Sequence, residues 1–350
     1  MRPRMVLHIG VNKTGTGSIQ TFFNRQRQSL LTLGVLYPTA GCRGHFHHPL
    51  SHLLGFGQQE KMTKEVRQER CEALKVSLLE EVERHSPQTT VISSEYFMLP
   101  RKILPVVEFF RDFDVKVVVY LRRHDHWRES AYKQGLKTVV QPLHDGGFDA
   151  WLQYQQSKNS RYGDYRLLVD TWAQAFGKDN IIVRPFERQQ NQPDIVTDFL
   201  ISTGMSDVAE QVDVSVPRIN EGLSNRAVRL LEVVQRMTLD PAKRKQILTY
   251  ALQMPRDSEH ASLASPAVRR SLVERNLDDY SYIAREYLDR DDGQLFCEEL
   301  PELDEQWSAP PLLSQLDVTQ EIENSITYHR AGLSWSRRWA AILRGVFGKR

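Results

Sequence analysis

A lysine stands inside a short loop of glycine, threonine and serine close to the start of the chain. The loop reads Gly-Val-Asn-Lys-Thr-Gly-Thr-Gly-Ser over residues 10–18, between an apolar stretch and a segment of helical pattern. Such a loop points successive backbone N–H groups at one place, and the following helix adds positive potential there. It is therefore expected to bind a phosphate or sulfate group. The residues expected to bind it are Lys13, Thr14, Gly15, Thr16, Gly17 and Ser18, the lysine through a full charge and the hydroxyls through hydrogen bonds.

The place of this lysine differs from its place in the Walker A loop of ATPases and GTPases. A Walker A loop reads Gly-x-x-x-x-Gly-Lys-Ser/Thr, with the lysine directly after the second glycine. Gly10 and Gly15 have that spacing here, but Thr16 takes the lysine position. An ordinary nucleotide hydrolase is therefore disfavoured. A P-loop-like kinase or nucleotide-binding protein with an unusual loop remains the second hypothesis.

A second anion site is indicated further along the chain. An apolar run, residues 117–121, is followed by Arg122, and Ser130 lies eight positions beyond it in a segment of helical pattern. Ligands collect at the carboxyl ends of strands in open α/β sheets. A guanidinium binds phosphate through two hydrogen bonds, and a serine hydroxyl adds one more. Arg123 is a neighbour that could contribute, and a charged helix start without a ligand is the plainer alternative.

Together the two motifs resemble those of the sulfotransferases that use 3′-phosphoadenosine 5′-phosphosulfate (PAPS). A lysine followed by Thr-Gly-Thr-x-Ser resembles the 5′-phosphosulfate loop of that family, and the flanking His-Ile-Gly and Ser-Ile-Gln are similar to its bacterial branch. Arg122 and Ser130 have the spacing of its 3′-phosphate motif. The resemblance extends over residues 5–224 and is specific only in these two motifs.

The resemblance implies in-line transfer of a sulfuryl group from PAPS to a hydroxyl of a carbohydrate or another small molecule, with no metal required. Lys13 would stabilise charge on the leaving oxygen. The family uses a glutamate or a histidine as the base, and two candidates are open. Glu95, which follows an apolar stretch, is preferred, and His48, in a cluster with His45 and His47, is the second choice. A cap or ion pair for the glutamate, and a metal site or solvated loop for the histidines, are the alternatives.

Short apolar runs that alternate with longer amphipathic segments predict an α/β fold with a central, mostly parallel sheet and a helical C-terminal part. The resemblance adds that this is a P-loop-like domain of three layers. The expected strands are residues 5–10, 89–94, 115–121 and 180–184. The expected helices are residues 16–33, 124–137, 164–176, 193–203, 224–236 and 266–288, the last with Ser265 as its N-cap.

Three segments are expected in the domain organisation. Residues 1–300 form the catalytic domain, residues 301–332 a proline-containing linker or strap, and residues 333–350 a basic amphipathic helix. The last has an apolar face with basic residues mostly outside it. Such a helix suits peripheral contact with an anionic membrane, or docking on the protein itself.

Bulk composition excludes several classes of protein. Apolar residues make up 40% and charged residues 26% of the chain, which predicts a globular core. A net charge of +2 gives no polycation for nucleic acid. The three cysteines form no CxxC pair, which favours reduced thiols. No stretch of the sequence has the roughly 18 apolar residues of a membrane span. A cytoplasmic protein is therefore expected. A non-catalytic anion-binding protein is the third hypothesis; no motif identifies the acceptor or the oligomeric state.

Overall fold

The computed structural model describes residues 2–57, 62–99, 101–144, 146–158, 161–215, 222–255, 262–303 and 306–329. The chain divides into two compact units, each built from separate stretches of sequence. The sheet unit comprises Met1–His124, Ser160–Asn220 and Leu272–Leu300. The helical unit comprises Asp125–Asn159, Glu221–Ser271 and Pro301–Arg350. Residues 1–300, expected to form one catalytic domain, thus contribute to both units.

A five-stranded sheet forms the centre of the sheet unit. Its strands are β1 (Arg4–Gly10), β2 (Val35–Leu36), β3 (Thr89–Ser93), β4 (Asp114–Leu121) and β5 (Ile181–Pro185). They lie in the order β2-β3-β1-β4-β5, and every neighbouring pair is parallel. All carboxyl ends therefore meet at one edge, where the loop after the central strand β1 begins. The α/β class predicted from the sequence is confirmed.

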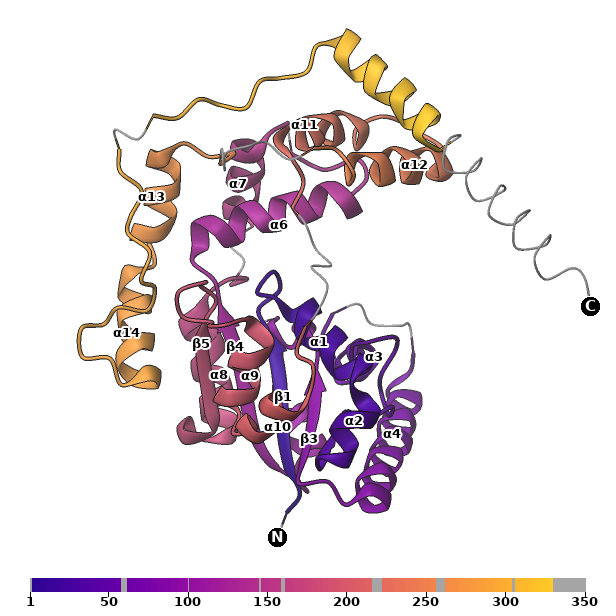
Figure 1. Ribbon diagram of the computed structural model, residues 1–350, viewed down its shortest axis with the longest axis vertical. Coiled ribbons are helices and arrows are strands. Elements are labelled where there is room, and N and C mark those ends of the chain that lie inside the picture. The colour runs from indigo at the N-terminus through magenta and orange to yellow at the C-terminus, as the bar shows by residue number, and fades with distance from the viewer. Residues whose placement is uncertain are drawn as a thin grey trace, which may run out of the picture. The chain divides into compact units, whose positions relative to one another are not determined.

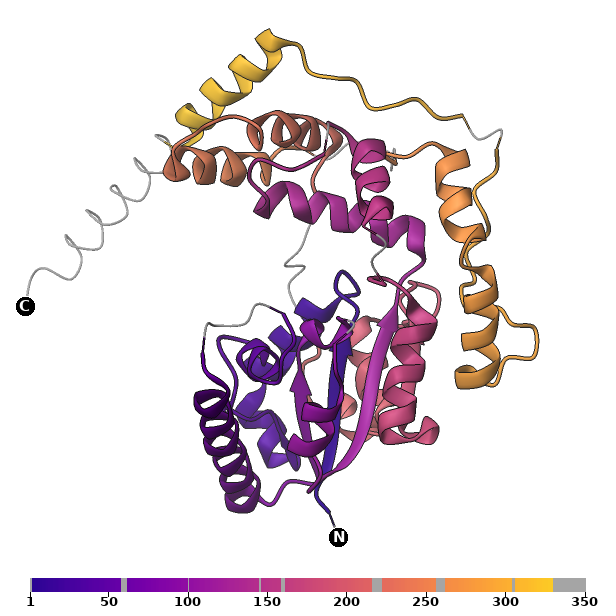
Figure 2. The ribbon, with the colours of Figure 1, turned by 180° about the vertical axis from the view of Figure 1, so that it is seen from behind.

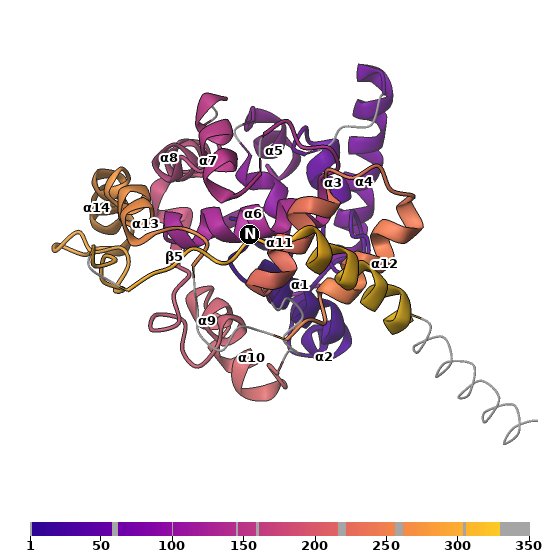
Figure 3. The same ribbon diagram turned by 90° about the horizontal axis from the view of Figure 1, so that it is seen from above.

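Helices cover both faces of this sheet, which gives three layers. On one face lie α1 (Thr16–Arg25), α9 (Ile195–Ser202) and α10 (Ser206–Gln211), and on the other α5 (Leu104–Phe109) and α8 (Tyr165–Phe176), as Figures 1, 2 and 3 show. Buried side chains fill the first interface, among them Val6 and Val118 of the sheet, Phe22 and Phe23 of α1, and Phe199 of α9. Because both faces are covered, the central strands are apolar along almost their whole length.

The sheet unit contains further helical elements. They are α2 (Arg27–Thr32), α3 (His48–Leu53), α4 (Lys64–His85), α14 (Leu277–Leu288) and the short 3-10 turns η1 (Glu95–Met98) and η2 (Lys178–Asn180). The single helix expected over residues 16–33 is interrupted at Gln26, whose N–H closes α1 on the carbonyl of Phe22. The sequence pattern predicts neither α3 nor α4. In α4 only Leu78 and Val82 are buried, so the helix lacks the apolar stripe on which such a prediction depends.

The described part of the helical unit consists of helices. They are α6 (His124–Thr138, whose first residue belongs to the sheet unit), α7 (Phe148–Ser157), α11 (Asn225–Val234), α12 (Pro241–Ala251), α13 (Pro266–Glu274, whose last three residues belong to the sheet unit) and a helix over residues 315–329. The side chain of Ser265 accepts the N–H of Val268 at the start of α13, which confirms the predicted N-cap. The helix expected over residues 266–288 is two helices, because the N–H of Asn276 turns back to the carbonyl of Val273.

The C-terminal part departs from its expected organisation in one respect. Residues 315–329, expected to lie within a linker, are helical because Val318, Glu321 and Ser325 are buried at helical spacing. The basic helix expected over residues 333–350 lies outside the described residues. Within the described ranges, no helix is both long and apolar enough to cross a lipid bilayer.

Candidate functional site

The loop after β1 has the backbone conformation of an anion-binding concavity. Gly10, Lys13 and Gly15 all have positive φ, of 91°, 66° and 75°. A lysine in the left-handed region is uncommon, and alternation between left- and right-handed conformations turns neighbouring N–H groups towards one side. A Cβ at Gly15 would lie 3.0 Å from the ring of Phe186, so the loop also needs this glycine for space. The predicted loop is therefore built to present N–H groups at the start of α1.

One hydroxyl of the loop is used inside it. The side chain of Thr14 is fully buried and its hydroxyl donates to the carbonyl of Val11. Its single hydroxyl proton is thus used within the loop, and the role of Thr14 in binding a ligand stays a prediction. Thr16 is also nearly buried, at the first position of α1, while Lys13 and Ser18 remain partly exposed.

Arg122 lies against this loop. It follows β4, and its Nη1 donates to the carbonyl oxygen of Lys13 at 2.9 Å. Its guanidinium also lies 5.6 Å from the ring centre of Phe186. The arginine that the sequence assigns to a second anion site therefore also stabilises the conformation of the first.

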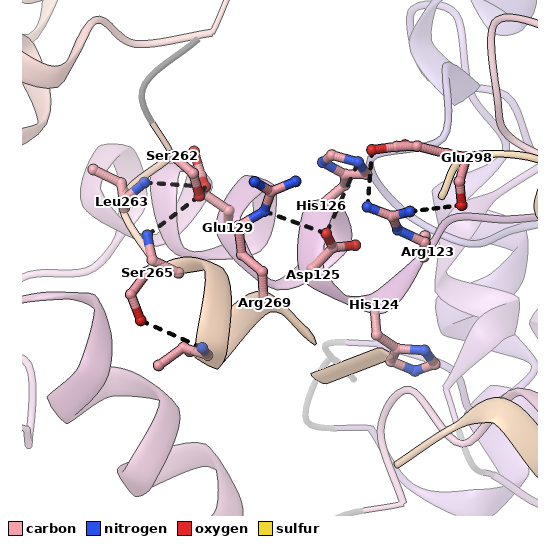
Figure 4. A network of polar contacts seen from close by, with 12 residues as sticks. Arg123, His124, Asp125, His126, Glu129, Ser262, Leu263, Ser265, Arg269 and Glu298 are labelled. Atoms are coloured by element: carbon pink, nitrogen blue, oxygen red, sulfur yellow. Dashed lines mark hydrogen bonds and ion pairs between the residues drawn. The ribbon is translucent and has the colours of Figure 1, made fainter. Parts of the chain in front are cut away.

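The next arginine has a different role. Arg123 is 3% exposed, and its Nη1 donates to the carbonyls of Glu298 and Glu299 at 3.0 and 2.7 Å. Its Nη2 lies 2.8 Å from the carboxylate of Glu298 (Figure 4). Arg123 therefore holds a late segment of the sheet unit, and the preference for Arg122 over Arg123 as the ligand arginine stays a prediction. Ser130 lies in α6 within the helical unit, and its pairing with Arg122 stays a prediction.

The two candidate bases lie together. Glu95 begins η1 directly after β3, and its Oε1 is 3.4 Å from Nε2 of His48, at the start of α3. The other carboxylate oxygen, Oε2, accepts a hydrogen bond of 2.9 Å from Nε2 of Gln20 on α1. A Cβ on Gly10 would lie only 2.9 Å from the Cα of Glu95. The pair of Glu95 and His48 therefore adjoins the first residue of the loop over residues 10–18, which we call the phosphate loop after its predicted ligand.

These contacts set the charge of the carboxylate. Burial alone would raise the pKa of Glu95, but the hydrogen bond and charge of His48, together with the hydrogen bond from Gln20, lower this pKa to about 2. Glu95 is therefore ionised at neutral pH. A carboxylate of such low basicity is a poor proton acceptor but a good partner for an imidazolium.

A chain of hydrogen bonds fixes the proton on His48. The hydroxyl of Ser51 donates to the carbonyl of His48 at 2.8 Å, and a carbonyl can only accept. The hydroxyl of Ser94 donates in turn to Ser51 at 2.9 Å, and Nδ1 of His48 lies 2.9 Å from Ser94. Both ring nitrogens of His48 therefore have a partner, since Nδ1 lies beside Ser94 and Nε2 beside the carboxylate of Glu95. Because an ionised carboxylate can only accept, the proton of the neutral ring lies on Nε2. Nδ1 is then the basic atom, and the hydroxyl of Ser94 can rotate towards it.

Aromatic rings hold the imidazole in place. The ring of Phe46 stacks on His48 at 4.0 Å between centres, and the edge of Tyr96 meets it at 4.6 Å. The side chain of His48 is 14% exposed, so it can still be reached from solvent. A fixed and reachable imidazole with a carboxylate behind it has the arrangement of a general base.

The other histidines near this site are structural. His47 is buried; its Nε2 donates to the carbonyl of Pro38 at 3.1 Å and its Nδ1 accepts the N–H of Ser93 at 3.3 Å. His8 of β1 is buried too, with Nδ1 2.8 Å from the hydroxyl of Ser93. Burial lowers the pKa of each to about 4, against the opposing effect of hydrogen bonds for His47 and of Glu95 for His8. His45 contributes its carbonyl, which accepts from Tyr37.

Sequence reasoning misses the residues that hold the pair. Gln20, Ser51 and Ser94 each contact Glu95 or His48 directly, and none carries a signal of its own type. Gln20 could have been noticed, because it lies one turn into the helix after the loop and faces the sheet. Among the described residues, no group of three or more His, Cys, Asp or Glu side chains is arranged to hold a metal ion.

Comparison with known proteins gives limited relationships. No family model matches the chain. An uncharacterised protein of Archaeoglobus fulgidus is 28% identical over 171 residues, which are 47% of this chain and 44% of that protein. The match thus spans less than half the length of this curated relative. The crystal structure of a sulfotransferase from Alicyclobacillus acidocaldarius aligns with 79% of this chain and 95% of its own, with a TM-score of 0.38 and 14% identity.

Proposed function

We propose that the chain is a PAPS-dependent sulfotransferase that acts on a hydroxyl group, of a carbohydrate or another small molecule. The proposal is based mainly on one observation, which is that an anion-binding loop and a pair of ionisable side chains adjoin each other at one edge of the sheet. The phosphate loop with Lys13 supplies positive potential, and the pair of Glu95 and His48 supplies a proton acceptor beside the first residue of that loop. Transfer of a charged group between oxygens needs both parts.

The residues of the loop fit the activated end of PAPS. The N–H groups of residues 13–17 at the start of α1 form a concavity suited to the 5′-phosphosulfate. Lys13 would neutralise charge on the oxygen that leaves, and Arg122 would hold the backbone of Lys13 in position. PAPS supplies the activated sulfuryl group and the bisphosphate that departs. Ser130 would contact the 3′-phosphate with Arg122, as the motif implies.

His48 is the favoured base, with Glu95 as its partner. Nδ1 of His48 would take the proton of the acceptor hydroxyl as the oxygen attacks sulfur, while Nε2 donates to Glu95, whose carboxylate would stabilise the imidazolium that results. The sequence ranks Glu95 first, but a pKa of about 2 leaves that carboxylate a weak base at neutral pH. One S–O bond forms to the acceptor, one S–O bond to the bisphosphate breaks, and the proton ends on the imidazole.

The test compares nucleotides and then measures transfer. Adenosine 3′,5′-bisphosphate and PAPS are expected to raise the thermal midpoint, since a ligand at about 100 times its Kd adds about 2.7 kcal/mol to the free energy of unfolding. ATP with Mg²⁺ is the control ligand. Incubation with ³⁵S-labelled PAPS and panels of glycans, phenols and lipid alcohols should then give a labelled product. Stabilisation by Mg-ATP alone would replace the proposal with a kinase, and binding without transfer to any class of acceptor would favour a non-catalytic protein.

A further inference from the structure

The sheet unit has a cavity of about 700 Å³ that is open to solvent, and its lining includes no residue of the loop over residues 10–18. Its walls come from the end of α3, the first half of α4, and residues 101–111, which include α5. Sites for small molecules commonly have volumes of roughly 300–1,000 Å³. The cavity is therefore large enough for an organic ligand.

Positive charge is concentrated in this cavity. The cationic lining residues are Lys64, Arg67, Lys75, Arg101, Lys102 and Arg111. Against these six cations the described lining has two acidic residues, Glu72 and Glu108, and Asp112 beside it forms ion pairs with Lys75 and Arg111. The whole chain carries a net charge of only +2, so the excess belongs to this site and not to the protein in general. Clefts lined by one sign of charge attract ligands of the opposite sign.

The helix α4 places its cations on one side. Lys64, Arg67, Cys71 and Lys75 follow one another at intervals of three or four residues, which puts them on one face of the helix. The only core contacts of α4 are those of its second half, where Leu78 and Val82 are buried. The first turns of the helix thus present their inner face to the cavity instead of to a packed core.

Two of the cations are held in position. Nη1 of Arg67 donates to the carbonyl of Leu53 at 3.3 Å, which ties α4 to the end of α3. The side chain of Lys75 is 12% exposed, and its ammonium lies 2.6 Å from the carboxylate of Asp112. The remaining wall has an apolar part, made by Leu54, Pro105 and Phe109. A ligand with both charged groups and a carbon skeleton fits such a lining.

We infer that this cavity binds a small organic molecule that carries at least two oxyanion groups. Guanidinium groups bind carboxylate, sulfate and phosphate through paired hydrogen bonds, and the ammonium groups add point charges. The six cationic and two acidic side chains of the lining leave an excess of positive charge that a single oxyanion would balance only in part. The inference does not depend on the proposed sulfuryl transfer, since none of its residues belongs to that site.

Cys71 gives a readout that is specific to this cavity. The chain has three cysteines, all free, so the double substitution Cys42→Ser and Cys297→Ser leaves the thiol of Cys71 as the only one. Burial raises the pKa of this thiol, and its alkylation by iodoacetamide should be followed at mildly alkaline pH. Fructose 1,6-bisphosphate, citrate and fructose are the probes, two with several oxyanion groups and one neutral.

The anionic probes are expected to slow the alkylation of Cys71 about tenfold at about ten times their Kd, because bound ligand occupies the cavity. Fructose should give no protection. The double variant Arg101→Ser and Lys102→Ser should lose most of the protection, whereas Arg84→Ser and Arg188→Ser, which removes two exposed cations outside the cavity lining, should keep it.

Three outcomes would overturn the inference. The first is alkylation unchanged by either anionic probe, with a far-UV circular dichroism spectrum and a thermal midpoint equal to those of the parent as evidence of folded protein. The second is equal loss of protection in the two double variants, which would reduce the effect to overall charge. The third is equal protection by inorganic sulfate at the same concentration, which would leave no role for the carbon skeleton. Protection by only one of the anionic probes supports the inference and identifies the preferred oxyanion.

Discussion

The phosphate loop and the pair of Glu95 and His48 adjoin each other at one edge of the sheet, yet they are built in opposite ways. The loop is one continuous segment, residues 10–18, whose glycines and lysine adopt the required conformation themselves. The pair is assembled from separate segments, with Gln20 on α1, His48 on α3 and Glu95 after β3. A local motif is fixed mainly by its own backbone, whereas a dispersed one depends on the packing of three elements.

This difference predicts how each region responds to change. In the loop, a single substitution at Lys13 can remove the charge and keep the backbone carbonyl that Arg122 binds. In the pair, one substitution alters the state of both partners, because His48 and Gln20 together lower the pKa of Glu95. Effects on the pair should therefore be strongly coupled, and effects on the loop should not.

Lys13→Ala is expected to give the largest effect. Loss of a charge that stabilises a developing anion should lower kcat by about 10³-fold, at the upper end of what one such group contributes. The thermal midpoint should change little, because Lys13 is partly exposed. Steady-state rates with labelled PAPS measure the effect, and Lys178→Ala, a lysine with a surface ion pair to Glu286, is the control. A kcat within threefold of the parent value, which is a change of roughly 0.7 kcal/mol in activation free energy, would contradict a catalytic role for Lys13.

His48→Ala should follow, with a loss in kcat of about 10²-fold, typical of a general base. Glu95→Gln should cost less, and the double variant should be no slower than His48→Ala, because the carboxylate acts through the imidazole. A complete double-mutant cycle of kcat, with binding of adenosine bisphosphate as the control for folding, measures this coupling. Independent, multiplicative losses would contradict the pairing, and a dead Glu95→Gln beside an active His48→Ala would make the glutamate the base.

The same contrast explains what could be predicted from the sequence. The loop, its strand and the helix after it are read directly, since glycine spacing and apolar runs are local signals. Both candidate bases are found, but not their contact, which depends on the placement of η1 beside α3. Arg123 looks like a ligand cation in the sequence, yet its side chain turns to Glu298, more than 170 positions away. No local pattern encodes such a partner.

The division into two units is missed for a related reason. Helices of the helical unit are drawn from three stretches of sequence between and after those of the sheet unit. A helix such as α11 has a clear apolar face, but the spacing of its apolar residues does not identify the element that covers that face. In α11, for example, Arg229 and Glu232 form an ion pair at 2.9 Å, while Glu232 also accepts from Tyr132 of α6. Such contacts become visible only in three dimensions.

The last prediction concerns the pH dependence of stability and the two buried histidines beneath both regions. His8 and His47 contact Ser93, which also accepts a hydrogen bond of 3.2 Å from Gln20, so they underlie the loop helix and the pair alike. Each imidazole has a pKa lowered from 6.5 to about 4 by burial, and is therefore neutral in the folded chain at pH values where the unfolded chain protonates it. The stability that depends on the neutral form is complete above pH 6.5 and is lost as the pH falls towards 4.

Across that window each histidine should lower the free energy of unfolding by about 1.4 kcal/mol per pH unit. Urea denaturation at several pH values between 4.5 and 7.5 measures the slope. His8→Asn and His47→Gln should each reduce it by one proton, and the double variant by two, whatever their effect on stability at pH 7.5. Glu95 does not add to this slope. Its pKa is lowered from 4.5 to about 2, so its contribution to the free energy of unfolding is lost only below pH 4.5. A slope that His8→Asn leaves unchanged would mean that this imidazole is protonated in the folded chain, and that the strand beneath the loop carries a charge next to Glu95.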